Sequence, residues 1–219
     1  MCAQFIVKGH LKDLEKFYGI SVPETWSKSV NVRVLPHQQA PVIVASGEAL
    51  NLVSMSFSLI PSWSKTRRVK FATHNARLET VAEKPTWRRP FAEAHCVVPM
   101  TFFVEPIYTG EYAGHMVAFS EKQEAFLLAA GVWDSWVDPE TGEVLDSFAI
   151  LTDTPNEFVA HTGHDRMPLF LDPSHVPLWL KAKDKAPGDW LSFLKAHRAT
   201  LGMKVKKDRA MRPGWEKRA

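Results

Sequence analysis

The amino-acid sequence predicts an α+β protein with a mainly antiparallel, barrel-like β core and short flanking helices. Segments typical of strands outnumber helical segments, and most of them follow one another without an intervening helix. This order favours an antiparallel sheet over the alternating βαβ units of a doubly wound fold. The length of 219 residues, of which 45% are hydrophobic, fits one main domain.

Eight apolar or alternating segments predict strands. They cover residues 30–35, 42–45, 50–59, 97–98, 102–105, 116–119, 125–133 and 148–152. In the third segment, four polar residues interrupt the apolar positions, as expected for a half-buried strand: Asn51, Ser54, Ser56 and Ser58. Turns are predicted at residues 61–64 and 138–142, where proline, serine, aspartate and glycine gather.

Short helices flank these strands. Apolar residues at helical spacing predict a helix over residues 10–18, and Gly19 ends it. Thr154 as N-cap and Pro155 at the first helical position predict a second helix. Asp172, which is also followed by proline, gives the same signal before a third. Helices are thus expected over residues 80–83, 176–180 and 189–197 as well.

Residues 1–202 are predicted to form a single domain, and residues 203–219 a basic, mobile tail with too few apolar residues to pack. No window offers about 18 uninterrupted apolar residues, so no membrane span is expected. The N-terminus lacks the features of a secretion signal. Cys2 and Cys96 are too few for a disulfide framework. These features predict a reducing, cytoplasmic setting, and a monomer is the default expectation.

Charge is unevenly distributed along the chain. The 27 basic and 24 acidic residues leave a net charge of +3. Residues 63–90 hold eight basic and two acidic side chains (net +6), and residues 203–219 hold seven and two (net +5). Residues 91–165 hold one basic and thirteen acidic side chains (net −12). This excludes a uniformly basic surface. Residues 63–90 predict either a strip that follows a phosphate backbone or a solvated face.

Cys2 is the first candidate for chemistry, because only Met1 precedes it. Removal of Met1 leaves a thiol and an α-amine on adjacent carbons, and both are partly nucleophilic near neutral pH. Such a 1,2-aminothiol condenses with an aldehyde to an imine, and the thiol then closes a thiazolidine ring. The alternative is a cysteine that stands second in the chain by chance.

Three further residues suit acid–base chemistry. Asn75 lies in the basic strip, Glu105 ends an apolar strand, and His164 precedes an apolar run. A carboxylate at a strand end and an imidazole before a strand can face one pocket, where they would serve the dehydration of a carbinolamine. His161 lies three residues before His164, but the second ligand pair of a zinc site is missing. Neither a metal nor another cofactor is expected.

Seven stretches stand in a characteristic order within residues 1–180. They are residues 1–2, 59–63, 75–85, 96–105, 129–133, 150–152 and 164–168, and the strings NARLETVAEKP and HDRMP are the most specific. Together they resemble the SOS response-associated peptidase (SRAP) family, whose members protect abasic sites in single-stranded DNA. The resemblance implies an SRAP-like fold and a role in the DNA damage response.

The resemblance also implies a role for each catalytic candidate. Cys2 is similar to the nucleophile that forms a thiazolidine with the ring-opened abasic sugar. Asn75 resembles the residue that holds the amine or the sugar, and Glu105 the general acid/base near the amine. His164 resembles the acid/base that helps to open the sugar ring. The family name implies a self-processing step that removes Met1.

Single-stranded DNA with an abasic site is the partner that the resemblance implies, so the protein would associate with the nucleoid when bound to DNA. Arg77 and Arg166 resemble phosphate ligands, since a guanidinium binds two oxygens. Trp63 stands where the family stacks against bases, and Arg67 and Arg68 belong to the basic groove around it.

Two departures from the family pattern bear on DNA binding. Ala3 and Gln4 replace the usual Gly-Arg after the cysteine, so a hydrogen-bonding side chain remains but its charge is lost. Pro106 replaces the usual tryptophan after Glu105, which removes an aromatic surface and a backbone N–H. Two alternative functions therefore stay open: an N-terminal-nucleophile cysteine amidohydrolase or peptidase, and a degenerate, non-catalytic single-stranded DNA-binding protein.

Overall fold

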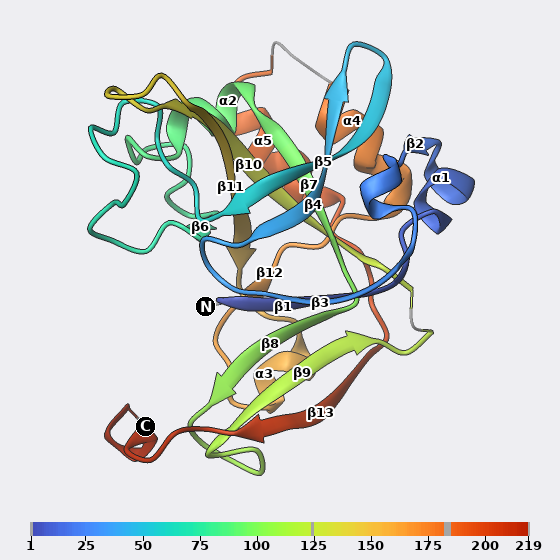
Figure 1. Cartoon of the computed structure of the whole chain (residues 1–219). Helices are drawn as coiled ribbons and strands as arrows, with labels where there is room; N and C mark the ends of the chain where they lie inside the picture. The colour runs from blue at the N-terminus through green and yellow to red at the C-terminus, as the bar shows by residue number, and fades with distance from the viewer. Residues whose placement is uncertain (1, 124, 182–184, 219) are drawn as a thin grey trace.

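The fold is built on a closed barrel of five strands (Figure 1). The strands are β4 (Gln39–Ser46), β5 (Ala49–Phe57), β7 (His95–Met100), β10 (Leu127–Val137) and β11 (Val144–Asp153). Neighbouring strands are antiparallel except β5 and β11, which pair in parallel at Phe57 and Phe148 and close the barrel. The computed structural model describes residues 2–123, 125–181 and 185–218.

Three short strands extend the barrel sheet. They are β2 (Ile20–Ser21), β6 (Asn75–Arg77) and β12 (Met167–Pro168). The strand β2 pairs with β5, whereas β6 and β12 both pair with β11. Because β6 and β12 share one partner strand, segments about ninety residues apart in the sequence meet at β11.

A second, antiparallel sheet lies beside the barrel. Its order is β13 (Met203–Ala210), β9 (His115–Glu121), β8 (Phe102–Ile107), β1 (Gln4–His10) and β3 (Ser29–Val34). Thr101 alone separates β7 from β8, and its backbone N–H donates to the Ile6 carbonyl at 2.8 Å. Figure 1 shows the consequence: β1 and the N-terminus lie between the barrel and the β8–β9–β13 layer.

The helices are short and lie around the two sheets. They are α1 (Asp13–Tyr18), α2 (Arg88–Glu93), α3 (Glu157–His161), α4 (Val176–Lys181) and α5 (Pro187–Ala196), with 3-10 turns η1 (Glu24–Trp26), η2 (Pro173–His175) and η3 (Trp215–Arg218). Among the described residues, every helix is too short or too polar to serve as a membrane span.

One predicted N-cap is wrong, one is confirmed, and one predicted helix is absent. The N-cap of α3 is Asn156 rather than Thr154, because the Asn156 side chain accepts a hydrogen bond from the Val159 N–H. Residues 80–83 form turns, and the proline at position 85, which has no N–H, prevents their continuation as a helix. The Asp172 side chain caps the 3-10 turn before α4 as expected, accepting from the Ser174 N–H.

The α+β class and all eight predicted strands are confirmed, since each predicted segment overlaps an observed strand. Five strands were not predicted: β1, β2, β6, β12 and β13. The prediction of an unpacked tail is wrong for Met203–Ala210, which forms β13 against β9. Met203 is buried, and the Lys206 ammonium lies 4.5 Å from the Phe102 ring centroid. The ammonium group of Lys206 thus makes a cation–π contact with β8, although its side chain is exposed.

Aromatic packing joins β1 to the barrel. The Phe5 ring meets Phe57 edge-on with centroids 5.3 Å apart, and Phe57 stacks on Phe148 at 5.2 Å. On the barrel strand β10, a Cβ at Gly131 would lie 2.8 Å from the Ala149 carbonyl and 2.9 Å from Cys96 Sγ. Only glycine fits between these two atoms. Cys96 is fully buried, as expected of a small core residue.

Candidate functional site

The four candidate catalytic residues come from four separate segments. Cys2 precedes β1, Asn75 begins β6, Glu105 lies on β8, and His164 lies between α3 and β12. Each side chain is buried: Cys2 and Glu105 have no exposed surface, and Asn75 and His164 expose 8% each. The sheet pairings described above bring them to the junction of the barrel and the second sheet.

Asn75 contacts Cys2 directly. Its Nδ2 donates to the Cys2 carbonyl oxygen at 3.0 Å. The pairing of Asn75 with Ile150 on β11 fixes the backbone at this position, and the Ile150 N–H donates to the His74 carbonyl at 3.0 Å. Within the described part of the chain, the buried Oδ1 of Asn75 has no hydrogen-bond partner. An acceptor is therefore available beside the Cys2 backbone.

Glu105 and His164 form a buried ion-pair contact. The His164 Nε2 lies 3.3 Å from the Glu105 Oε2. The Nδ1 lies 2.7 Å from the Arg166 carbonyl oxygen, which only accepts, so Nδ1 is the donor in this contact. The backbone N–H of Arg166 lies farther away, at 3.2 Å. The imidazole Nε2 therefore faces the Glu105 carboxylate.

The thiol of Cys2 is kept in its neutral form. Burial, and secondly the negative charge of Glu105, raise the pKa of this thiol well above its ordinary value. The Sγ lies 3.5 Å from the Gln4 carbonyl. Burial also lowers the pKa of His74, against a smaller opposing effect of Glu105. His74 therefore belongs to the same charge environment, although no sequence motif predicted its place there.

The Arg166 side chain binds other residues of this chain. Its Nη1 and Nη2 bind the two Glu79 oxygens, the second at 2.9 Å, and Nη2 also donates to the Thr152 carbonyl at 2.8 Å. The hydrogen bond raises the pKa of Arg166 and lowers that of Glu79. This arrangement differs from the phosphate ligand that the sequence predicts, because the guanidinium is buried and occupied by Glu79.

The predicted DNA-binding side chains lie around the exposed segment between β5 and β6. Trp63 is 58% exposed, and Arg67 lies 4.0 Å from Glu143. Arg67 and Arg68 line one pocket of about 360 Å³. Arg77 lines another, of about 390 Å³, that reaches Asn75. This second pocket also contains Lys84, which belongs to the NARLETVAEKP string, and the 53% exposed Phe71, which the sequence did not single out. The signal that could have identified Phe71 is its position as an aromatic residue within the basic residues 63–90.

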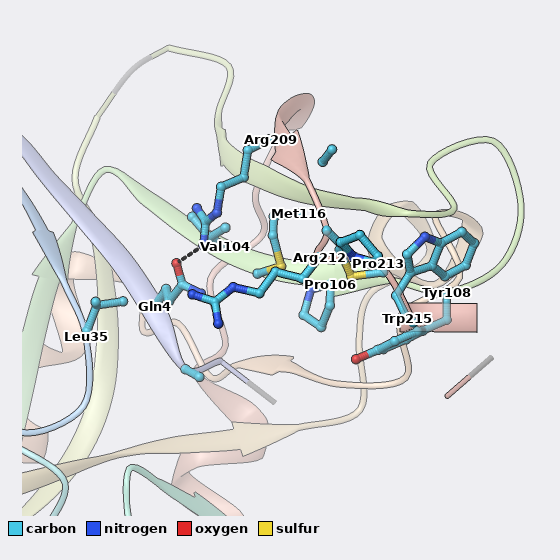
Figure 2. A pocket seen from close by; sticks show the side chains of 14 residues that line it. Gln4, Leu35, Val104, Pro106, Tyr108, Met116, Arg209, Arg212, Pro213 and Trp215 are labelled. Carbon is cyan, nitrogen blue, oxygen red and sulfur yellow. Dashed lines mark hydrogen bonds between the residues drawn. The ribbon is translucent and has the colours of Figure 1, made fainter. Parts of the chain in front are cut away.

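Gln4 and Pro106, the residues that differ from the family pattern, both line a third pocket, shown in Figure 2. The Gln4 Oε1 accepts from Arg209 Nη2 at 2.7 Å and from Arg33 Nη1 at 3.4 Å. Asp208 pairs with both guanidinium groups, at 2.7 Å from Arg33 and 2.6 Å from Arg209. Two arginines from distant strands thus gather at the side chain that replaces the family's arginine.

No cluster of three histidine, cysteine or acidic side chains suited to a metal ion occurs among the described residues. His95, in contrast to His164, is a residue of the core. Its ring stacks on Trp179 at 3.6 Å, and both ring nitrogens face backbone carbonyls of the core. Burial lowers the pKa of His95.

The barrel and the buried site around Cys2 define the class of protein: an α+β protein with a cysteine-based site at the edge of a closed barrel. A sequence model of the SOS response associated peptidase (SRAP) family matches residues 1–208. The chain belongs to this family.

Relatives support the assignment. The chain is 31% identical over 197 residues to the abasic site processing protein YoaM of Bacillus subtilis. This match covers 89% of this chain and 85% of that protein. It is 30% identical over 197 residues to the abasic site processing protein YoqW of Bacillus phage SPbeta, covering 89% and 86%. A crystal structure of a protein from Bacteroides thetaiotaomicron has a TM-score of 0.77 over 100% of both chains at 23% identity, which supports the fold.

Proposed function

We propose that this chain recognises abasic sites in single-stranded DNA and links to them covalently through a thiazolidine at Cys2, after removal of Met1. The observation that carries the proposal is the meeting of Cys2 with Asn75, Glu105 and His164 in one buried site. The names of the relatives, abasic site processing proteins, support the same substrate.

The proposed reaction consumes one aldehyde and releases one water. The Cys2 α-amine attacks the C1′ aldehyde of the ring-opened sugar and forms a carbinolamine. Loss of water gives an imine, whose carbon then receives the Cys2 sulfur. The thiol proton passes to the nitrogen, and the five-membered ring is closed. A thiol that burial keeps protonated suits this order, because the amine reacts first and the sulfur only afterwards.

Glu105 and His164 supply the protons that this sequence requires. Carbinolamine dehydration needs an acid for the leaving hydroxyl and a base for the nitrogen. The two side chains lie 3.3 Å apart and next to Cys2, where they can give and take protons. We assign Glu105 to the amine, and His164 to opening of the sugar ring. Reversal of the same steps by this pair would release the DNA.

Asn75 is proposed to position the reacting amine. Its Nδ2 already binds the Cys2 carbonyl, so the residue is fixed relative to the Cys2 backbone. Its buried Oδ1 can accept a hydrogen bond from the α-amine or from a sugar hydroxyl. Trp63, Arg67, Arg68 and Arg77 are proposed to contact the bases and phosphates of the strand.

The proposal includes self-processing, in which the site at Cys2 hydrolyses the peptide bond that follows Met1 and consumes one water. The chain is made in a cell-free system without methionine aminopeptidase and its intact mass is measured. We expect loss of Met1 in the wild type and retention in Glu105→Gln. Equal loss in both would assign the cleavage to another agent.

The linkage itself is tested by intact mass spectrometry of the Met1-free chain with single-stranded DNA that carries one abasic site. We expect a heat-stable adduct of one chain and one strand, one water lighter than their sum, with the modification mapped to Cys2. A strand with a tetrahydrofuran abasic analogue, which has no aldehyde, should give none.

Cys96→Ala is the matched control, because it removes the other cysteine and leaves the site intact. It should form the adduct, whereas Cys2→Ser should not. A Met1-free chain that binds DNA without an adduct would overturn the linkage and leave a non-catalytic binding protein. Hydrolysis of a small amide such as glutamine by that preparation would instead support the amidohydrolase.

A further inference from the structure

A pocket of about 760 Å³ lies between the start of β1, strand β8 and the end of the chain (Figure 2). Ala3 and Gln4, which directly follow Cys2, line one side. Val104 and Pro106, the two neighbours of Glu105, line another. The pocket therefore shares two chain segments with the Cys2 site. Its volume falls in the range of pockets that hold a small organic group.

The end of the chain supplies the pocket's charge. Arg209 is fixed by the Gln4 side chain at 2.7 Å and by Asp208 at 2.6 Å. Arg212 is exposed, and none of the described carboxylates lies within ion-pair distance of it. In Figure 2 its side chain extends along the pocket toward Gln4. A guanidinium that pairs with no carboxylate of the described residues, beside a second, fixed guanidinium, suits an anionic group such as a phosphate.

Aromatic side chains supply the pocket's apolar end. Trp215 and Tyr108 lie together there in Figure 2, near Pro213. Trp215 is fixed by a close approach to Gly114, where a Cβ would lie 2.8 Å from the indole Cζ2. The Met211 N–H also donates to the Gly114 carbonyl at 2.8 Å, which docks the segment after β13 on the β8–β9 turn. An indole held in this way can stack on a nucleobase.

We propose that this pocket binds one nucleotide of the DNA strand, next to the abasic site, with its phosphate at Arg212 and Arg209 and its base against Trp215 and Tyr108. The inference rests on the proposed function, because the strand held at Cys2 is what brings that nucleotide to the pocket. One nucleotide satisfies both ends of the pocket, since it carries an anion and an aromatic ring on one unit.

The test measures the rate of adduct formation against DNA concentration for three oligonucleotides. One has nucleotides on both sides of the abasic site, one only on the 5′ side, and one only on the 3′ side. Trp215→Ala should raise the half-saturating concentration of the first oligonucleotide roughly tenfold, as expected for one lost stacking contact. Arg212→Gln should raise it less, and its effect should fade at high salt. Trp215→Phe should restore most of the loss.

The side of the abasic site gives the decisive comparison. The loss in Trp215→Ala should appear with one of the two single-flank oligonucleotides and disappear with the other. Lys195→Gln, which removes an exposed charge on α5, should change nothing. Equal losses with both single-flank oligonucleotides, or none with any, would overturn the subsite.

Failure of the proposed function would look different, because the wild type would then form no adduct with any oligonucleotide. In that case fluorescence anisotropy with undamaged single-stranded DNA decides. Weaker binding by Trp215→Ala than by Lys195→Gln would keep a nucleotide-binding pocket, and equal binding would remove it.

Discussion

The Arg166 guanidinium binds both oxygens of Glu79 and thereby joins two segments of the site that lie 87 residues apart. Glu79 follows the strand that carries Asn75, and Arg166 follows His164 by two residues. The Arg166 carbonyl accepts from His164 Nδ1. One arginine therefore orients the imidazole with its backbone and fixes the Asn75 segment with its side chain.

Glu79→Gln should lower the free energy of unfolding by about 1 kcal/mol at pH 7, because the half-exposed carboxylate is partly screened by water. The pKa of Glu79 is lower in the folded state than its ordinary value of 4.5. Its contribution is therefore complete above pH 4.5 and is lost as the pH falls through the folded-state pKa. Urea unfolding at pH 7 and at pH 3 measures the difference.

Glu83→Gln is the matched control, since it removes an exposed carboxylate from the same segment. It should leave stability within about 0.5 kcal/mol of the wild type at both pH values. A Glu79→Gln deficit that persists unchanged at pH 3 would mean that the charge of Glu79 is not its source.

Glu105 and His164 should act as one unit. If they share a transferable proton, Glu105→Gln and His164→Asn should each slow adduct formation by roughly a hundredfold, the lower end for general acid–base catalysis. The double variant should be little slower than either single one, because the first change already disables the pair. Rates at saturating DNA measure this. Fully multiplicative losses would show that the two residues share no proton and act independently, each in its own step.

The Cys2 thiol should resist alkylation in the folded chain that retains Met1. Its raised pKa leaves little thiolate at pH 8, and its side chain has no exposed surface. We expect iodoacetamide to modify it at least about tenfold more slowly than in the urea-unfolded chain. Mass spectrometry of the alkylated peptides reports this rate. Rapid modification of the folded chain would show that the thiol is open to solvent and ionised.

The sequence predicted the barrel better than the second sheet. Strands such as β5 and β11 carry apolar runs or alternation that indicate burial directly. In β13, Met203 and Val205 do alternate with lysines, but the number of charges concealed the pattern. The short β6 and β12 have no pattern of their own, because pairing with β11 alone makes them strands.

The site, like the fold, was predicted only in part from the sequence. Residue type and family resemblance pointed to Cys2, Asn75, Glu105 and His164, and the structure brings them together. The partner of Arg166 was beyond prediction, because a buried arginine and a phosphate-binding arginine look alike in sequence. Only the three-dimensional position of Glu79 distinguishes them.

Strand β13 should be required for stability. Truncation after Gly202 removes the buried Met203 and leaves β9 as an unpaired edge. We expect a loss of more than about 2 kcal/mol from apolar burial alone, together with self-association. Thermal unfolding and light scattering measure both. Truncation after Met211, which keeps β13, should unfold near the wild-type temperature. Equal behaviour of the two truncated chains would show that β13 adds no stability.

Trp63 should contribute to DNA binding and not to folding. Its side chain is 58% exposed, in the segment between β5 and β6 that extends away from the barrel in Figure 1. Trp63→Ala should therefore change the free energy of unfolding by no more than about 0.5 kcal/mol. Loss of one base stack should weaken binding of single-stranded DNA by about 1 to 3 kcal/mol. Anisotropy titrations at two salt concentrations measure the affinity.

Leu178→Ala provides the comparison, because Leu178 is similarly exposed, at 54%, but lies on α4, outside the basic strip. It should leave the affinity unchanged. Because stacking carries no charge, Trp63→Ala should keep the wild-type salt dependence, whereas Arg67→Gln should reduce the slope by about one ion. An affinity loss in Trp63→Ala that comes with a fall in thermal stability would instead assign the indole to folding.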